Sequence, residues 1–131
     1  GKYYLVDIDG TIIIEKTKEY DLENFIIISG DESPPALRGL IKELNIHFSE
    51  LISQLNKLDF IEKRRWNITL KNNLLIKLPD SKINKALENL KNLFVNEKVL
   101  QSNIIEIDLR IEGRASLKVD EGKINYGIND I

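Results

Sequence analysis

The sequence predicts an α+β domain, in which an antiparallel-rich β-sheet of hairpins has one face covered by helices and ends in an open terminal edge strand. Apolar and polar residues alternate through 65–78 and again through 105–119, which is the period of a strand with one buried face. Apolar residues recur at helical spacing within 34–57 and 81–95. Because antiparallel hairpins commonly bury one face of a sheet, these two helical segments are the expected cover.

The composition fits one globular domain. The chain has 131 residues, of which 42% are hydrophobic, and its net charge is −2, so it can bury a core. Acidic and basic residues are interspersed, without the basic field that nucleic-acid binding requires. The absence of cysteine excludes a disulfide framework and a thiolate metal site. The longest apolar runs, such as 25–28, fall far short of the ~20 residues of a membrane helix.

The extent of the chain indicates a piece of a longer protein. It contains no methionine, so Gly1 is not expected to be a native start. We therefore expect any membrane anchor or targeting segment to lie outside 1–131. Neither an internal repeat nor a low-complexity tract divides these residues, which indicates a single domain.

The first predicted elements are three short strands. Residues 2–8 and 11–14 are β-branched and apolar, and Asp9-Gly10 between them favours a type I′ hairpin turn. The segment 25–29 is a short apolar run that ends at a glycine, as a buried strand does.

A helical region follows. Ser33 precedes two prolines and is the expected N-cap of a helix with proline in its first turn. Leucine and isoleucine then recur at helical spacing, with a break expected near Asn45 and a second helical stretch up to residue 57.

The clearest hairpin of the sequence joins 65–71 to 74–78. Both segments alternate apolar and polar residues, and asparagine tolerates positive φ, so Asn72-Asn73 is the expected two-residue turn. Trp66 lies on the apolar face, so we interpret it as a core residue.

The C-terminal half continues with a helix and a last hairpin. Residues 79–81 end the preceding strand and are expected to cap the amphipathic helix 81–95. The strands 105–111 and 114–119 alternate around the turn at Glu112-Gly113. The polar segment 120–131 contains no obvious further strand, which leaves 114–119 as the edge of the sheet.

One short stretch suggests an enzyme. Residues 4–13, YLVDIDGTII, match the start of haloacid-dehalogenase-like phosphatases, in which Asp7 would attack phosphorus, Asp9 would transfer protons and Mg²⁺ would bridge carboxylate and phosphate. That chemistry needs a parallel sheet and further acidic residues at its strand ends. The acidic Asp31 follows too soon after Asp9 to leave room for crossovers of a dozen or more residues. The phosphatase is therefore the alternative, and a hairpin turn is favoured.

The predicted edge strand 114–119 favours a protein-binding function. Unpaired backbone N–H and C=O groups at a sheet edge can pair with a strand of another protein. Arg110, Arg114 and Lys118 project from the polar face and could pair with acidic groups of such a partner. The alternative is that these cations are ordinary solvated residues, and that Lys118 protects the edge against aggregation.

Four motifs in series resemble one known family. Residues 64–79, RRWNITLKNNLLIKLP, resemble the Arg-Arg-Trp hairpin of the FtsQ/DivIB bacterial cell division proteins. A leucine-rich helix of matching length follows, and 104–110, IIEIDLR, resemble that family's Ile-Asp-Leu-Arg strand. The opening Tyr-Leu-Val-Asp also resembles the hairpin that enters the family's β domain. The resemblance extends from residue 3 to about residue 120.

The resemblance implies a non-enzymatic scaffold of the divisome without catalytic residues, cofactor or metal. The family's β domain lies in the periplasm, behind a membrane helix and a POTRA domain; residues 1–131 would then be the β domain, beginning at the POTRA–β junction. The expected partners are FtsB and FtsL, which the family binds by strand addition to its last strand. Carried onto this sequence, the partner-binding residues are Arg64, Arg65, Arg110, Ile111, Gly113, Arg114, Ala115, Ser116, Leu117 and Lys118.

Overall fold

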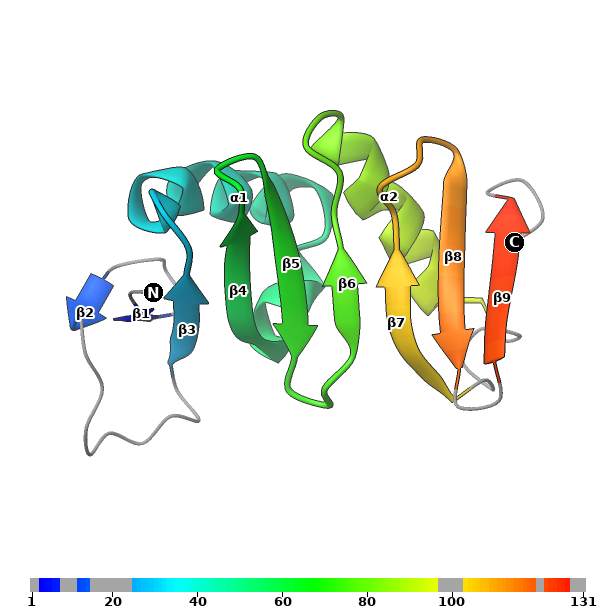
Figure 1. Cartoon of the computed structure of the whole chain (residues 1–131), viewed down its shortest axis with the longest axis horizontal. Helices are drawn as coiled ribbons and strands as arrows, with labels where there is room; N and C mark the ends of the chain where they lie inside the picture. The colour runs from blue at the N-terminus through cyan, green and yellow to red at the C-terminus, as the bar shows by residue number, and fades with distance from the viewer. Residues whose placement is uncertain (1–2, 8–11, 15–24, 97–102, 120–121, 128–131) are drawn as a thin grey trace.

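The fold is one β-sheet with helices on a single face, as Figure 1 shows. The computed structural model describes residues 3–7, 12–14, 25–96, 103–119 and 122–127. Within them, the strand order across the sheet is β2-β1-β3-β4-β5-β6-β7-β8-β9. The strands are β1 (Tyr3–Val6), β2 (Ile12–Ile14), β3 (Ile26–Ser29), β4 (Leu55–Ile61), β5 (Arg65–Leu70), β6 (Leu75–Lys77), β7 (Ile104–Asp108), β8 (Arg114–Val119) and β9 (Gly122–Gly127).

Two helices cross from strand to parallel strand. The helix α1 (Ser33–His47), with the 3-10 helix η2 (Ser49–Gln54), connects β3 to β4, and α2 (Ile83–Phe94) connects β6 to β7. All other neighbouring strands are antiparallel. The predicted fold class is thus confirmed, with two parallel pairs placed where a helix intervenes.

The predicted N-terminal hairpin is present, and the structure adds the neighbour of its first strand. β1 pairs antiparallel with β2 and, on its other side, with β3. The Asp9-Gly10 turn lies outside the described residues. The helix α1 begins at Ser33, but its N-cap is Glu32, which has φ 62° and makes no side-chain capping bond. The N-cap assigned to Ser33 was wrong: its hydroxyl is buried and has no hydrogen-bond partner among the described residues.

The strand β4 replaces the end of the predicted helix. Residues 55–57 were expected to be helical because Leu55 continues the helical spacing of Leu51 and Ile52. The next apolar residue of the strand, Leu58, follows Leu55 by three residues. Both side chains are buried in the structure. A register irregularity between Leu55 and Lys57 inserts an extra residue, so that a strand acquires a helix-like spacing.

The β5–β6 hairpin is confirmed, although its turn is one residue longer than predicted. Thr69 pairs with Leu75, so Leu70 faces Leu74 and three residues form the loop. The Leu70 amide donates to the Leu74 carbonyl at 2.9 Å. Asn73 takes φ 71°, the left-handed conformation that asparagine tolerates. The buried alternation on both strands requires this register, because a two-residue turn would place the two apolar sets on opposite faces.

The helix α2 also lacks the predicted cap. Its N-cap is Lys82, with φ 55° and no side-chain capping bond, so the capping assigned to 79–81 was wrong. The helix presents Ala86, Leu87, Leu90 and Leu93 to the sheet. No helix within the described residues is long and apolar enough to span a lipid bilayer.

The core lies between the helices and one face of the sheet. Its fully buried members alternate along the strands, which is the pattern of a sheet covered on one side. They include Leu37, Leu44, Leu87, Leu90 and Leu93 from the helices and Ile28, Leu58, Ile68, Ile76, Ile107 and Leu117 from the strands. Trp66 belongs to this core, 4.7 Å from the Phe60 ring centroid, as the sequence predicted.

The opposite face of the sheet carries polar side chains. Ser29 donates a hydrogen bond to Asp59, and Lys77 lies 3.4 Å from Glu106 on the neighbouring strand. We call this surface the open face, because neither α1 nor α2 covers it in Figure 1.

Candidate functional site

Two predicted binding arginines converge at one end of the sheet. Arg65 begins β5, and Arg110 follows β7 by two residues. The strand register brings them to the same end: Lys77 of β6 stands opposite both Asn67 of β5 and Asp108 of β7, and Arg65 and Arg110 each lie two residues further toward that end. The charges of Arg110 and Asp108 both act on the guanidinium of Arg65. Burial, and then the positive charge of Arg110, lower the pKa of Arg65. Residues that are far apart in the sequence thus form one cationic group on the open face.

Asp108 holds Arg110 in place. Its carboxylate accepts hydrogen bonds from Arg110 Nε at 3.0 and 3.1 Å, from Nη2 at 2.7 Å and from the backbone N–H at 3.0 Å. Burial raises the pKa of Asp108, but the hydrogen bonds and charge of Arg110 outweigh it, so the pKa lies below its usual value of 3.8. The same hydrogen bonds raise the pKa of Arg110. The pair is therefore charged at neutral pH.

Arg64 takes a different position from Arg65. It lies in the β4–β5 turn, where Nη2 is 3.4 Å from Glu62 and 63% of the side chain is exposed. Arg65 instead donates from Nη1 to the Asn67 side chain at 2.7 Å on the strand itself. Of the two arginines carried over from the resemblance, Arg65 is the one that the structure brings together with Arg110.

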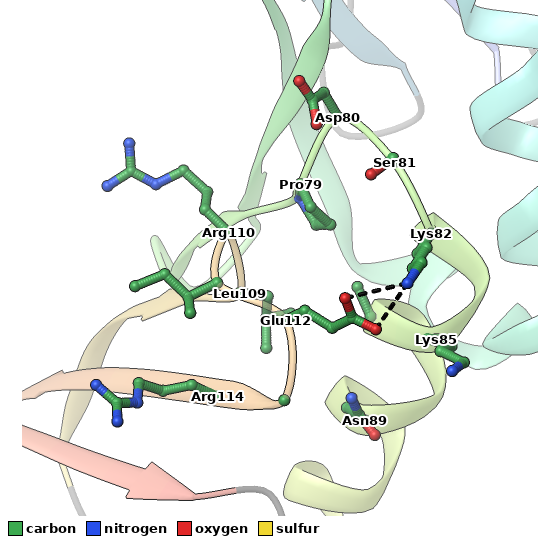
Figure 2. Close-up of a pocket in the computed structure, with 13 residues that line it drawn as sticks. Pro79, Asp80, Ser81, Lys82, Lys85, Asn89, Leu109, Arg110, Glu112 and Arg114 are labelled. Atoms are coloured by element: carbon green, nitrogen blue, oxygen red, sulfur yellow. Dashed lines mark hydrogen bonds and ion pairs between the residues drawn. The ribbon is translucent and has the colours of Figure 1, made fainter.

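The β7–β8 turn joins the cationic group to a pocket. Ile111 is 63% exposed, and the Arg114 amide donates to its carbonyl at 3.1 Å. Gly113 takes φ 74°, which closes this turn. A pocket of about 320 Å³ lies between the turn and the first turns of α2. Figure 2 shows Arg110 and Arg114 on the side of the pocket away from α2.

The opposite wall of the pocket is tied to the turn by an ion pair. Lys82 Nζ lies 2.9 and 3.1 Å from the two carboxylate oxygens of Glu112 (Figure 2). The hydrogen bond and then the charge of Lys82 lower the pKa of Glu112. Sequence reasoning missed Lys82, because no local pattern links a helix start to a turn thirty residues later. It also missed Asp108, although its i, i+2 spacing from Arg110 places both on one face of a strand.

The remaining predicted residues belong to β8. Ala115 and Leu117 are fully buried on the helix face, so their side chains cannot contact a partner. Arg114 and Lys118 are exposed, and Ser116 is half-buried on the open face.

The expectation that β8 is the open edge was wrong. β9 pairs with it antiparallel over its whole length, from Arg114 opposite Gly127 to Val119 opposite Gly122. The edge of the described sheet at this end is therefore β9. The segment 122–127, GKINYG, was missed because it has glycine at both ends and lacks a run of β-branched residues.

The stretch that suggested a phosphatase has different surroundings from those the chemistry needs. Asp7 directly follows β1, and β1 pairs antiparallel with both of its neighbours. The parallel neighbours that would bring further strand ends beside Asp7 are not present around β1. Asp9 lies outside the described residues.

His47 connects the two helices. Its Nδ1 lies 2.8 Å from Glu88 on α2, and its Nε2 lies 3.4 Å from Glu43 on α1. It is distant in the fold from the arginine group, because it lies on the helix side of the sheet.

Comparison with known proteins assigns the family. Residues 1–110 match the family model described as cell division protein FtsQ/DivIB, C-terminal. A protein named cell division protein FtsQ from Rhizobium radiobacter is 29% identical over 71% of this chain and 44% of its own length. The protein of that name from Agrobacterium fabrum is also 29% identical, over 71% of this chain and 29% of its own length. One from Bradyrhizobium diazoefficiens is 34% identical over 47% of this chain and 18% of its own length.

The match covers the arginine group of the site and ends before the β7–β8 turn and β8. The family model includes β1 through β7 and ends at Arg110, so it contains both Arg65 and the Asp108–Arg110 pair. The chain spans less than half the length of these curated relatives. On the extent of this match, the chain belongs to the FtsQ/DivIB family of bacterial cell division proteins.

Proposed function

We propose that this chain is a non-enzymatic scaffold domain of the divisome that binds FtsB and FtsL at the C-terminal end of its sheet. The observation that supports this most is that Arg65 and Arg110 lie at the same end of the open face, next to the β7–β8 turn. Family membership supports the cell division function, and the cationic group offers a place where a partner could be recognised.

Strand addition suits this end of the sheet. A terminal strand leaves one row of backbone N–H and C=O groups for pairing, which gives affinity to any extended segment. Each such hydrogen bond contributes only about 0.5–1.5 kcal/mol net, and it carries no information about sequence. Side chains beside the strand must therefore select the partner.

Arg110 is suited to that selection. Asp108 occupies Nε and Nη2, which fixes the plane of the guanidinium. Arginine has five N–H donors, so others remain for a partner carboxylate. Because the side chain is already ordered by Asp108, a partner that binds it has less rotamer freedom to restrict.

The neighbouring turn adds an apolar contact. Ile111 is a large exposed hydrophobic residue beside the pocket. A partner segment with one acidic and one apolar side chain could therefore contact Arg110 and Ile111 together. Gly113 and Arg114, at the start of β8, lie beside them, and the free backbone edge at this end of the described sheet belongs to β9.

We further propose a place for the domain in the cell. The chain would be the β domain of a longer protein, held on the periplasmic side of the inner membrane at the septum by an N-terminal helix, with a POTRA domain between them. This placement follows the family resemblance.

Calorimetry with a synthetic periplasmic C-terminal segment of FtsB tests the proposal. Arg110→Ala is expected to weaken binding at least tenfold, because a charge-assisted hydrogen bond contributes about 1.5–3 kcal/mol. Arg38→Ala, an exposed arginine on α1, is the matched control and should bind as the unsubstituted chain does. Equal affinity of both variants, or no binding by the unsubstituted chain, would reject this surface.

A further inference from the structure

We propose that β9 occupies the position beside β8 that a partner strand takes on binding. An acidic strand of the partner then replaces β9 there. This inference rests on the proposed function and names the chemistry of the partner strand. It starts from the finding that the chain's own segment 122–127 pairs with the strand expected to be open.

Geometry favours replacement over addition outside β9. Neighbouring strands lie about 4.8 Å apart, so a strand added beyond β9 would be about 10 Å from β8. Arg110 and the turn at Ile111 lead directly into β8. In Figure 1, β9 is the outermost strand at this end of the sheet and lies next to β8. A partner strand that takes the place of β9 therefore lies next to β8 and one strand spacing closer to Arg110 than a strand added outside β9.

The register of β9 on β8 sets residues opposite one another whose charges do not complement each other. Lys118 stands directly opposite Lys123, and like charges at directly opposed positions destabilise a strand pair. Arg114 stands opposite Gly127, which offers no side chain, and Ser116 stands opposite Asn125. On its other side, Lys118 stands opposite Glu106 of β7, a matched pair. β9 thus provides backbone pairing without complementary charge.

Exchange makes these side-chain pairs decisive. When a partner strand replaces β9, the backbone hydrogen bonds that break and those that form are of the same kind, so their contributions largely cancel. The balance is then set by the residues that stand opposite β8: Ile124 and Tyr126 opposite the buried Leu117 and Ala115, and the residues opposite the exposed Arg114 and Lys118. A partner strand can match the first pair with its own apolar residues, so the charged positions are where it can improve on β9. An acidic residue opposite Lys118 would turn a repulsive pair into an attractive one. The partner strand is therefore one that carries carboxylates at these positions.

Tethering makes β9 a regulator of affinity. A strand on the same chain as its binding site has a high effective concentration, so a free partner binds more weakly while β9 is present. The glycines at both ends of β9 lower its intrinsic preference for the strand. The mismatched charge pair and the glycines keep the internal pairing replaceable.

Two variants test the replacement of β9 by the FtsB segment, with binding measured by calorimetry. A chain that ends at Val119 is expected to bind several-fold more tightly than the full chain, because no internal strand competes. Lys123→Glu, which places a carboxylate opposite Lys118, is expected to bind several-fold more weakly. Lys42→Glu makes the same charge change on exposed α1 and should leave the affinity unchanged.

Amide hydrogen exchange on the free chain supplies a second measurement that needs no partner. Lys123→Glu is expected to slow exchange in β9 relative to the unsubstituted chain, and Lys42→Glu is not. Unchanged exchange in Lys123→Glu, or tighter partner binding by it, would overturn the inference. If the full chain binds and the chain ending at Val119 binds no better, only the replacement of β9 by the partner strand is rejected. If no form binds, the proposed function fails as well.

Discussion

The central and the terminal hairpin of the sheet are built from the same antiparallel pairing but differ in their surroundings. The β5–β6 hairpin lies in mid-sheet, with Trp66, Ile68 and Leu70 buried beneath the helices. The β8–β9 hairpin has one neighbour on its inner side and ends the sheet. The first is held by apolar burial, which is specific to its own sequence. The second contributes Ala115 and Leu117 of β8 to the core, and its outer strand β9 is paired on one side only within the described sheet.

The comparison shows how one sheet can be rigid and still accept a partner. Apolar side chains at the centre fix the register, because a slip of one residue would turn them to the open face. At the terminal hairpin, Lys118 and Lys123 stand opposite each other, and a pair of like charges does not favour this register. Binding at the edge can therefore change the last strand while the core stays unaltered.

The largest expected effect comes from the same substitution made in both regions. Ile68→Ala removes a fully buried side chain from β5 and should lower the free energy of unfolding by about 2–5 kcal/mol. Ile111→Ala, in the exposed turn before β8, should change it by less than about 0.5 kcal/mol. Urea denaturation measures both. Similar losses for the two variants would contradict the contrast between the regions.

Two glycines sharpen the comparison at the backbone. Gly30, after β3, has φ 108°, and a Cβ added there would collide with the Phe60 carbonyl. Gly30→Ala should lower stability by about 1–3 kcal/mol from backbone strain alone, and by more once the collision is included. Gly113→Ala has open space around it and should cost only about 1 kcal/mol. Thermal unfolding of the two variants ranks them, and the reverse order would be inconsistent with the structure.

The Asp108–Arg110 pair should give the domain a pH dependence. The folded pKa of Asp108 lies below its ordinary value of 3.8, so the stabilisation is present above that pH and is lost as pH falls through the folded pKa. We expect Asp108→Asn to reduce stability by about 1 kcal/mol at pH 7 and to remove this part of the acid sensitivity. Denaturation curves at pH 7 and pH 3 measure the difference. A variant that retained the full acid sensitivity would exclude the pair as its source.

The smallest expected effect is at the turn of the central hairpin. Asn73 has φ 71°, a conformation that glycine adopts more easily. Asn73→Gly should change the free energy of unfolding by only a few tenths of a kcal/mol, because asparagine already tolerates this region. A loss above about 1 kcal/mol in chemical denaturation would indicate that the Asn73 side chain has a further contact.

The sequence predicted the elements whose side chains follow a regular period. The alternation from Trp66 to Leu78 identified the central hairpin, and the leucine spacing identified α2. The motif around Arg110 identified the candidate site, because it was read together with the Arg-Arg-Trp hairpin. These are the places where local pattern and tertiary burial agree.

The remaining features depend on contacts that no local period records. The irregularity near Leu55 gave a strand the spacing of a helix, and Ser33 is buried by packing rather than used as a cap. β9 forms by pairing with β8, although glycine stands at both of its ends and no run of β-branched residues identifies it. The ion pair of Lys82 with Glu112 requires the α2 crossover to exist first.

The most direct test of the account is residue-resolved amide exchange on the chain with and without the FtsB segment. The account predicts that β8 and the turn from Ile111 to Gly113 stay or become protected, while β9 loses its protection as the partner takes its place. Increased protection of β9, or changes confined to the helices or to the β1–β2 end of the sheet, would contradict it.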